Sequence, residues 1–229
     1  MCFSAKASFV ASATLAVIGC LSIKKARKHH SNALTLFAST PLLFSLQQLC
    51  EGFVWLSLTH KLPYYMYATN VCCFIFFAGI VWPMWSPLSL YSLETIKTRK
   101  RLLAITVVIG ILTASLYLLG LITQPIQAII NHHHIYYPVL SYPFNSINTI
   151  ALFIESIMPG IYFTSTVLPL FLSSIPLIWL LGIVQAVACL TSQIFFPSAT
   201  ASVWCFFAAI ASILIYIMVK KYKKQKGTS

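Results

Sequence analysis

The sequence predicts an all-α, polytopic membrane helix bundle with seven transmembrane helices, the N-terminus outside and the C-terminus in the cytoplasm. Of its 229 residues, 59% are hydrophobic and only 8% are charged, with a mean hydropathy of +0.86, which is far more apolar than a soluble domain. Apolar runs recur at lengths near the roughly 20 residues that a helix needs to cross a bilayer. Basic residues lie in every second connection between these runs.

The first three helices are expected near 7–23, 33–58 and 66–93, each bounded by a polar or charged break. The first apolar run ends at the basic segment 24–30 (KKARKHH), and the third ends just before Glu94. A cleaved lipoprotein signal is a rival for the first run, since it ends near a cysteine. Its basic residues follow the apolar run instead of preceding it, which argues against cleavage.

The remaining helices are expected near 102–123, 148–172, 174–196 and 200–219. The fourth follows the basic segment 97–101 (KTRKR), and the seventh precedes the basic tail 220–226 (KKYKKQK). The fifth and sixth meet at two serines with no charge between them, so a re-entrant pair is an alternative there. With loops this short, residues 1–229 form a single transmembrane domain.

The three basic segments fix the expected orientation. They hold 13 of the 15 Lys and Arg residues and leave only Lys6 and Lys61 in the other connections. Cytoplasmic connections are enriched in Lys and Arg, so the three segments are placed in the cytoplasm, which requires an odd number of spans. Because each cluster abuts an apolar run, we attribute the net charge of +12 to the lipid surface and not to nucleic acid binding.

Only three carboxylates are present, and two of them, Glu51 and Glu155, fall inside expected helices. An ionisable group in a membrane helix indicates a functional site by default. Both lie at a similar depth in the outer half, so we expect them to line one polar cavity with Gln47 and Gln48, and at least one to be protonated. Alternatively, Glu51 and the two glutamines only form interhelical hydrogen bonds.

Cysteines and histidines gather toward the expected outer side, where they are candidate metal ligands. Their spacing matches no metal-binding motif, and no cofactor is indicated. The seven cysteines, several of them within apolar runs, predict no disulfide framework. The candidate ligands are Cys2, His60, Cys72, Cys73, His132, His133 and His134.

Several membrane enzymes and photoreceptors are excluded by missing residues. The seventh helix has no internal lysine for a retinal Schiff base, and the chain has no aspartate and no histidine within a span for a metal hydrolase of the ceramidase type. No Gly-x-Ser-x-Gly segment is present. The sequence therefore favours a protein that is not an enzyme.

Three short motifs lie in the first quarter of the chain: residues 1–9 (MCFSAKASF), residues 41–44 (PLLF) and residues 47–55 (QQLCEGFVW), the last of which begins with Gln47 and includes Glu51. By these motifs the chain resembles an uncharacterised family of prokaryotic multi-pass membrane proteins. The resemblance implies the cytoplasmic (inner) membrane of a prokaryote as the location. It implies no activity, because such a family has none assigned.

The leading interpretation is a membrane protein with a polar cavity that opens outward, acting as a small-solute or ion transporter or as a sensor. One alternative is a metal-assisted membrane enzyme at the outer surface, and another is a structural membrane subunit. The expected partners are the lipid bilayer and a small solute or ion, and a homo-oligomer is compatible with the sequence. A further hint is that Pro41-Leu-Leu-Phe in the second helix resembles Pro176-Leu-Ile-Trp in the sixth, as in a repeated three-helix unit.

Overall fold

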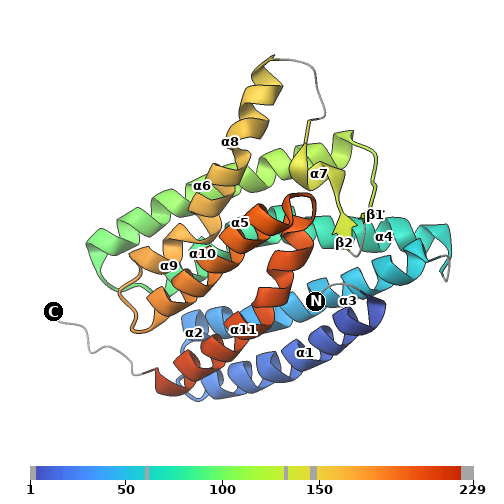
Figure 1. Ribbon diagram of the computed structural model, residues 1–229. Helices are drawn as coiled ribbons and strands as arrows, with labels where there is room; N and C mark the ends of the chain where they lie inside the picture. The colour runs from blue at the N-terminus through green and yellow to red at the C-terminus, as the bar shows by residue number, and fades with distance from the viewer. Residues whose placement is uncertain (1–3, 60–61, 132–133, 145–148, 223–229) are drawn as a thin grey trace.

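The first half of the chain forms four long helical crossings (Figure 1). A computed structural model describes residues 4–59, 62–131, 134–144 and 149–222. The first crossing is α1 (Ala5–Arg27), and the second joins α2 (Asn32–Ala38) to α3 (Thr40–Leu58). The third runs through α4 (Tyr64–Ile75), a π-helical segment η1 (Phe76–Val81) and α5 (Trp82–Leu93), and the fourth is α6 (Lys97–Thr123).

The second half begins with a short hairpin and returns to helices. Strand β1 (Ile129–Asn131) pairs antiparallel with β2 (His134–Tyr136), and a short α7 (Pro138–Ser141) follows. The helices are then α8 (Thr149–Thr166), α9 (Leu168–Leu172), α10 (Ile178–Phe195), a 3-10 turn η2 (Pro197–Ala199) and α11 (Thr200–Lys221). The sequence did not predict this hairpin: from it, residues 124–147 are expected to form an outer loop whose aromatic residues lie at the lipid headgroups as a belt or a lid.

Six helical segments of the described chain are long and apolar enough to cross a membrane. They confirm an all-α, multi-pass membrane protein, for which the bilayer is the natural solvent. The helix α11 corresponds to the seventh expected span but is not one of these six, so the count of seven stays a prediction, as does the orientation. The six segments are Ala5–Arg27, Asn32–Leu58, Tyr64–Leu93, Lys97–Thr123, Ala151–Leu172 and Ile178–Phe195.

The helices α1 and α6 extend further than their apolar runs. Lys24 to Arg27 form the last turn of α1, and Lys97 to Arg101 form the first turns of α6. Lysine and arginine are good helix formers, and their long side chains reach back to the lipid headgroups while the backbone remains helical. The ranges expected from the sequence, 7–23 and 102–123, stop at the charged residues, and α1 and α6 are therefore longer than these ranges.

Proline explains the breaks within the crossings. Pro41 follows the join between α2 and α3, Pro83 follows the π-helical segment η1, and Pro169 follows the join between α8 and α9. Because proline has no N–H to donate to the preceding turn, the helix before it tends to kink or change its hydrogen-bond pattern. Such breaks are tolerated in a membrane protein when neighbouring helices cover the freed carbonyls.

The described parts of the three basic segments, of which the last is described as far as Tyr222, lie at one end of the bundle, which we call the basic end. The ring of His29 contacts that of Tyr222 at a centroid distance of 5.8 Å, and one buried cluster joins Ala26, Leu93 and Val219 there. The β hairpin packs at the opposite end, which we call the hairpin end. This arrangement agrees with the alternation of charge along the sequence, and the orientation stays a prediction.

Small residues draw α1 and α3 together. Ser12 and Ser45 each donate a hydrogen bond to the other's backbone carbonyl at 2.8 Å, and a Cβ at Gly19 would lie 2.8 Å from the backbone nitrogen of Leu42. Close approach through small residues and reciprocal hydroxyl bonds is how membrane helices associate without a hydrophobic driving force. The pair forms a stable wall behind the cavity described next.

Candidate functional site

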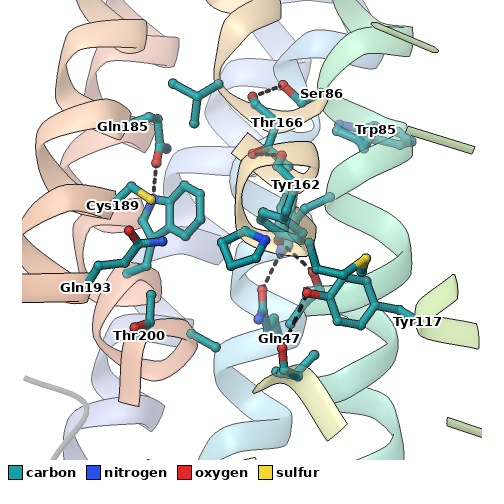
Figure 2. A pocket seen from close by; sticks show the side chains of 18 of the residues that line it. Gln47, Trp85, Ser86, Tyr117, Tyr162, Thr166, Gln185, Cys189, Gln193 and Thr200 are labelled. Atoms are coloured by element: carbon teal, nitrogen blue, oxygen red, sulfur yellow. Dashed lines mark hydrogen bonds between the residues drawn. The ribbon is translucent and has the colours of Figure 1, made fainter. Parts of the chain in front are cut away.

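A cavity of about 740 Å³ lies inside the bundle, with side chains from α3, α5, α6, α8, α10, α11 and the hairpin on its walls. This volume falls within the range of small-molecule sites. Figure 2 shows Gln185, Cys189 and Gln193 along one side of it, across from Tyr162 and Tyr117. The cavity is therefore enclosed by both halves of the chain.

The cavity is long as well as large. Its lining includes Glu155 and Tyr142 near the hairpin end, and Leu170 and Ile215 in the buried cluster at the basic end. On α8 alone, Glu155 and Thr166 are 11 residues apart, which corresponds to roughly 16 Å of helix. That is about half the thickness of the hydrocarbon core.

Two of the four residues predicted for a polar cavity, Gln47 and Glu155, line it. Glu155 is 8% exposed, and it accepts a hydrogen bond of 2.9 Å from the backbone N–H of Phe144. Gln47 is fully buried, and its side-chain oxygen accepts a hydrogen bond of 2.6 Å from the indole N–H of Trp82. That indole in turn stacks on Phe44 with ring centroids 3.8 Å apart.

The other two, Gln48 and Glu51, are not among the described lining residues of this cavity. They face the interface between α3 and α11. Glu51 is fully buried, and it accepts hydrogen bonds from the hydroxyl of Ser202 at 2.6 Å and from the amide of Gln48 at 3.0 Å. A shared site of Glu51 and Glu155 stays a prediction, while the hydrogen bonds of Glu51 fit the alternative role in helix packing.

The structure adds a polar stripe on α10 that the sequence analysis missed. Gln185, Cys189 and Gln193 recur every four residues, so they lie on one face of the helix, and all three line the cavity. The oxygen of Gln185 accepts a hydrogen bond of 2.6 Å from the indole N–H of Trp204 on α11. Gln185 and Gln193 are amides two helical turns apart in an otherwise apolar run, and this spacing is the sequence signal that could have indicated the polar stripe.

An aromatic row crosses the cavity between α6, α8 and α11. The rings of Tyr117 and Tyr162 meet edge to face at 6.0 Å, and those of Tyr162 and Trp204 at 5.8 Å. The hydroxyl of Tyr162 donates a hydrogen bond of 2.6 Å to the carbonyl of Ala78, which lies within the π-helical segment η1. These rings were not predicted as site residues, because aromatic residues inside membrane helices are usually only packing.

The metal hypothesis gains no support from the described residues. Cys72, Cys73 and His134 belong to them, and no group of three or more His, Cys, Asp or Glu side chains in that part of the chain could hold a metal ion. The ring of His134 instead packs against Phe196 at a centroid distance of 4.8 Å. The remaining candidates lie outside the described residues: Cys2, His60, His132 and His133.

Glu94 joins two loops at the basic end. Its carboxylate accepts hydrogen bonds from the backbone N–H and the hydroxyl of Ser174 at 2.7 and 2.6 Å, and from the N–H groups of Thr95 and Ile96 at 3.0 Å. Arg99 donates to the carbonyl of Ser173 at 3.0 Å. These hydrogen bonds connect the α5–α6 loop to the α9–α10 loop at the basic end of the bundle.

Replacing Glu94 with glutamine should destabilise the protein at pH 7 by about 1–2 kcal/mol. Burial alone would raise the pKa of Glu94, but the hydrogen bonds from Ser174, Ile96 and Thr95 outweigh it and hold this pKa below its ordinary value. The stability that Glu94 contributes is therefore present above its unfolded pKa, near 4.3, and is lost as the pH falls through the lower folded pKa.

Thermal unfolding of both proteins in detergent between pH 7 and pH 3 measures this effect. The gap in unfolding free energy between wild type and Glu94→Gln should be widest near pH 7 and should narrow below about pH 4. A gap that stays constant over the whole range would show that the charge of Glu94 is not what holds the two loops.

Two of the helices that line the cavity make few direct contacts with each other. The helix α8 packs against α5, α6 and α9, but in the described part of the chain it has no extensive contact with α10, although both line the cavity. In Figure 1 the N-terminal part of α8 stands clear of the other helices. The wall of the cavity is therefore least continuous between these two helices.

The sequence matches, over residues 1–229, a family of unknown function (DUF6629). This confirms the expectation of an uncharacterised family that the start of the chain suggested. No curated protein and no solved structure matches the sequence.

Proposed function

The chain belongs to the DUF6629 family of unknown function, and we propose from its geometry that it is a membrane transporter for a small solute. The observation that carries this proposal is the long cavity of about 740 Å³, which runs from the hairpin toward the basic end. A purely structural subunit has no need of such a space, because membrane helices without a ligand pack closely through van der Waals contact. We place the protein in the cytoplasmic membrane of a prokaryote, with the basic end inside.

Each side of the cavity has a glutamine that is hydrogen-bonded to a tryptophan, and this similarity favours a transporter rather than a protein that only binds a solute. Gln47 of α3 holds Trp82 on one side, and Gln185 of α10 holds Trp204 on the other. The helices α3 and α10 both begin at the basic end and run toward the hairpin end. Two similar halves around a central site are the usual architecture of proteins that alternate access by rocking one half against the other.

The closed basic end has the parts of an inner gate. Leu90, Leu170, Leu181 and Ile215 line the cavity and belong to the buried cluster that seals that end. The bonds of Glu94 and Arg99 hold the two loops beneath it together. To open this end toward the cytoplasm, the hydrogen bonds of Glu94 and Arg99 would be replaced by hydrogen bonds to water, and α9 and α10 would move. The helix break before Pro169 permits this movement.

Cysteine accessibility tests the proposal. In a variant with the native cysteines replaced by alanine, Gln193→Cys and Ser89→Cys place single thiols in the cavity near the hairpin end and the basic end. A charged methanethiosulfonate, which does not cross membranes, is applied to either face of sealed vesicles. For a transporter, Gln193→Cys should react from the hairpin face, and Ser89→Cys should react from both faces, because each gate opens in turn.

The control is Val108→Cys on α6, a position 56% exposed on the lipid-facing surface, which should react from neither face. If Ser89→Cys reacts only from the hairpin face, the cavity is a one-sided receptor and not a transport path. If neither cavity thiol reacts, the interior is dry and the structural role is correct. Each outcome therefore selects one of the three functions.

A further inference from the structure

The charge balance of the cavity differs sharply from that of the whole chain. The chain has 15 Lys and Arg residues against three carboxylates, yet the described lining residues include no Lys or Arg and a single charged residue, Glu155. Most of the described basic residues lie at the basic end, beyond the buried cluster that seals the cavity there. The one acidic or basic side chain among the described lining residues is therefore a carboxyl group.

The aromatic row that lines the cavity also favours a cation. The faces of Tyr117, Tyr162 and Trp204 carry the negative side of the ring quadrupole, which attracts cations within about 6 Å. Their polar edges are held by hydrogen bonds: Tyr162 to the carbonyl of Ala78 at 2.6 Å and Trp204 to Gln185 at 2.6 Å. The rings are thus positioned before any ligand arrives, so little conformational entropy is lost on binding.

We propose that the cavity binds an organic cation, a positively charged group carried on an apolar body, which deepens the proposed function and rests on it. Glu155 attracts the cation near the hairpin end, and the row of Tyr117, Tyr162 and Trp204 receives it further in. Glu155 and Tyr162 are seven residues apart on α8, so they share one face of the helix and lie about 10 Å apart along its axis. The ligand passes from a carboxylate to ring faces.

Other ligand classes fit the same walls poorly. An anion would meet no cationic partner among the described lining residues. A small inorganic cation needs several oxygen ligands to replace its water, and a single carboxylate among amides and rings does not supply them. An organic cation is weakly hydrated, so ring faces replace its hydration shell at small cost, while its apolar body occupies the apolar part of the cavity.

Tetraphenylphosphonium and tetraphenylborate make the sharpest test, because the two ions have nearly the same size and shape and opposite charge. Their binding to the protein in lipid nanodiscs is measured by equilibrium dialysis, with binding to empty nanodiscs subtracted. Tetraphenylphosphonium should bind at least tenfold more tightly than tetraphenylborate. Equal affinity, or tighter binding of the anion, overturns the proposal.

Two variants locate the site. Glu155→Gln and Tyr162→Leu should each weaken the binding of tetraphenylphosphonium by about five- to tenfold, as expected for one charge or one ring face, whereas Tyr162→Phe should retain it. Phe153→Leu, at a position 64% exposed on the outside of α8, is the matched control and should bind as the wild type does. If both Glu155→Gln and Tyr162→Leu bind as the wild type does, the cation is not held at this site.

The two proposals fail in different ways. If tetraphenylborate competes as well as tetraphenylphosphonium while the cavity thiols still react from both faces, the protein is a transporter and the cation class is wrong. If tetraphenylphosphonium binds selectively but Ser89→Cys reacts from one face only, the cation class is correct and transport is wrong. Unfolded variants are recognised by their melting curves, and the comparison of the two ions on the wild type does not depend on them.

Discussion

Gly110→Ala is expected to destabilise the bundle by about 2–3 kcal/mol, the upper range for overpacking a membrane or protein core. A Cβ at Gly110 on α6 would overlap the carbonyl oxygen of Pro83 and lie 2.9 Å from its carbonyl carbon. Both neighbours are backbone atoms of α5, so no side chain can rotate away. The helices would have to separate, which would also displace Trp82 and Trp85 from the cavity wall.

Gly160→Ala on α8 is the matched control, because a Cβ there meets no atom within 4 Å. In a helix interior this change should be neutral or stabilise by about 0.5–1 kcal/mol. Chemical unfolding of the three proteins in the same detergent, followed by tryptophan fluorescence, measures both effects. Equal stability of Gly110→Ala and Gly160→Ala would mean that α5 and α6 do not approach as closely as the structure shows.

The fold was largely predictable because its strongest signals are local. Apolar runs of spanning length and basic segments at alternate connections depend only on neighbouring residues, and the segment around Lys97–Arg101 shows both. Helix ends were less predictable, because Lys and Arg can continue a helix at the lipid surface. The hairpin at Ile129–Tyr136 was missed because its short strands are defined by pairing and packing on α4, which only the folded chain provides.

The candidate site was predictable only in part, because a cavity is formed by residues that are distant in the sequence. Glu155 and Gln47, which line the cavity, were conspicuous in the sequence because a polar group in a membrane helix is rare. Tyr162 and Trp204 were not, because nothing local separates a ring that faces a cavity from one that packs in a core. The partner of Glu51, Ser202, is 151 residues away, and a serine in an apolar run gives no signal of its own.

Glu51→Leu is expected to destabilise the protein by about 2 kcal/mol, because it leaves the hydroxyl of Ser202 and the amide of Gln48 without their acceptor inside the bundle. Glu51→Gln should cost less than about 1 kcal/mol, since the amide oxygen can still accept the bond from Ser202. Neither variant should change the reactivity of Gln193→Cys, because Glu51 is not among the described lining residues of the cavity.

A double-mutant cycle separates the role of Glu51 in packing from a role in function. Ser202→Ala removes the donor of the 2.6 Å bond, so Glu51→Leu should cost less in that background than in the wild type, by about 1 kcal/mol. Unfolding free energies of the four proteins provide the coupling. Additive effects would mean that the bond contributes nothing between α3 and α11. If Glu51→Gln instead loses solute binding while its stability is unchanged, Glu51 has a functional role together with Glu155. The reason is that glutamine can replace glutamate in packing but not as an acid.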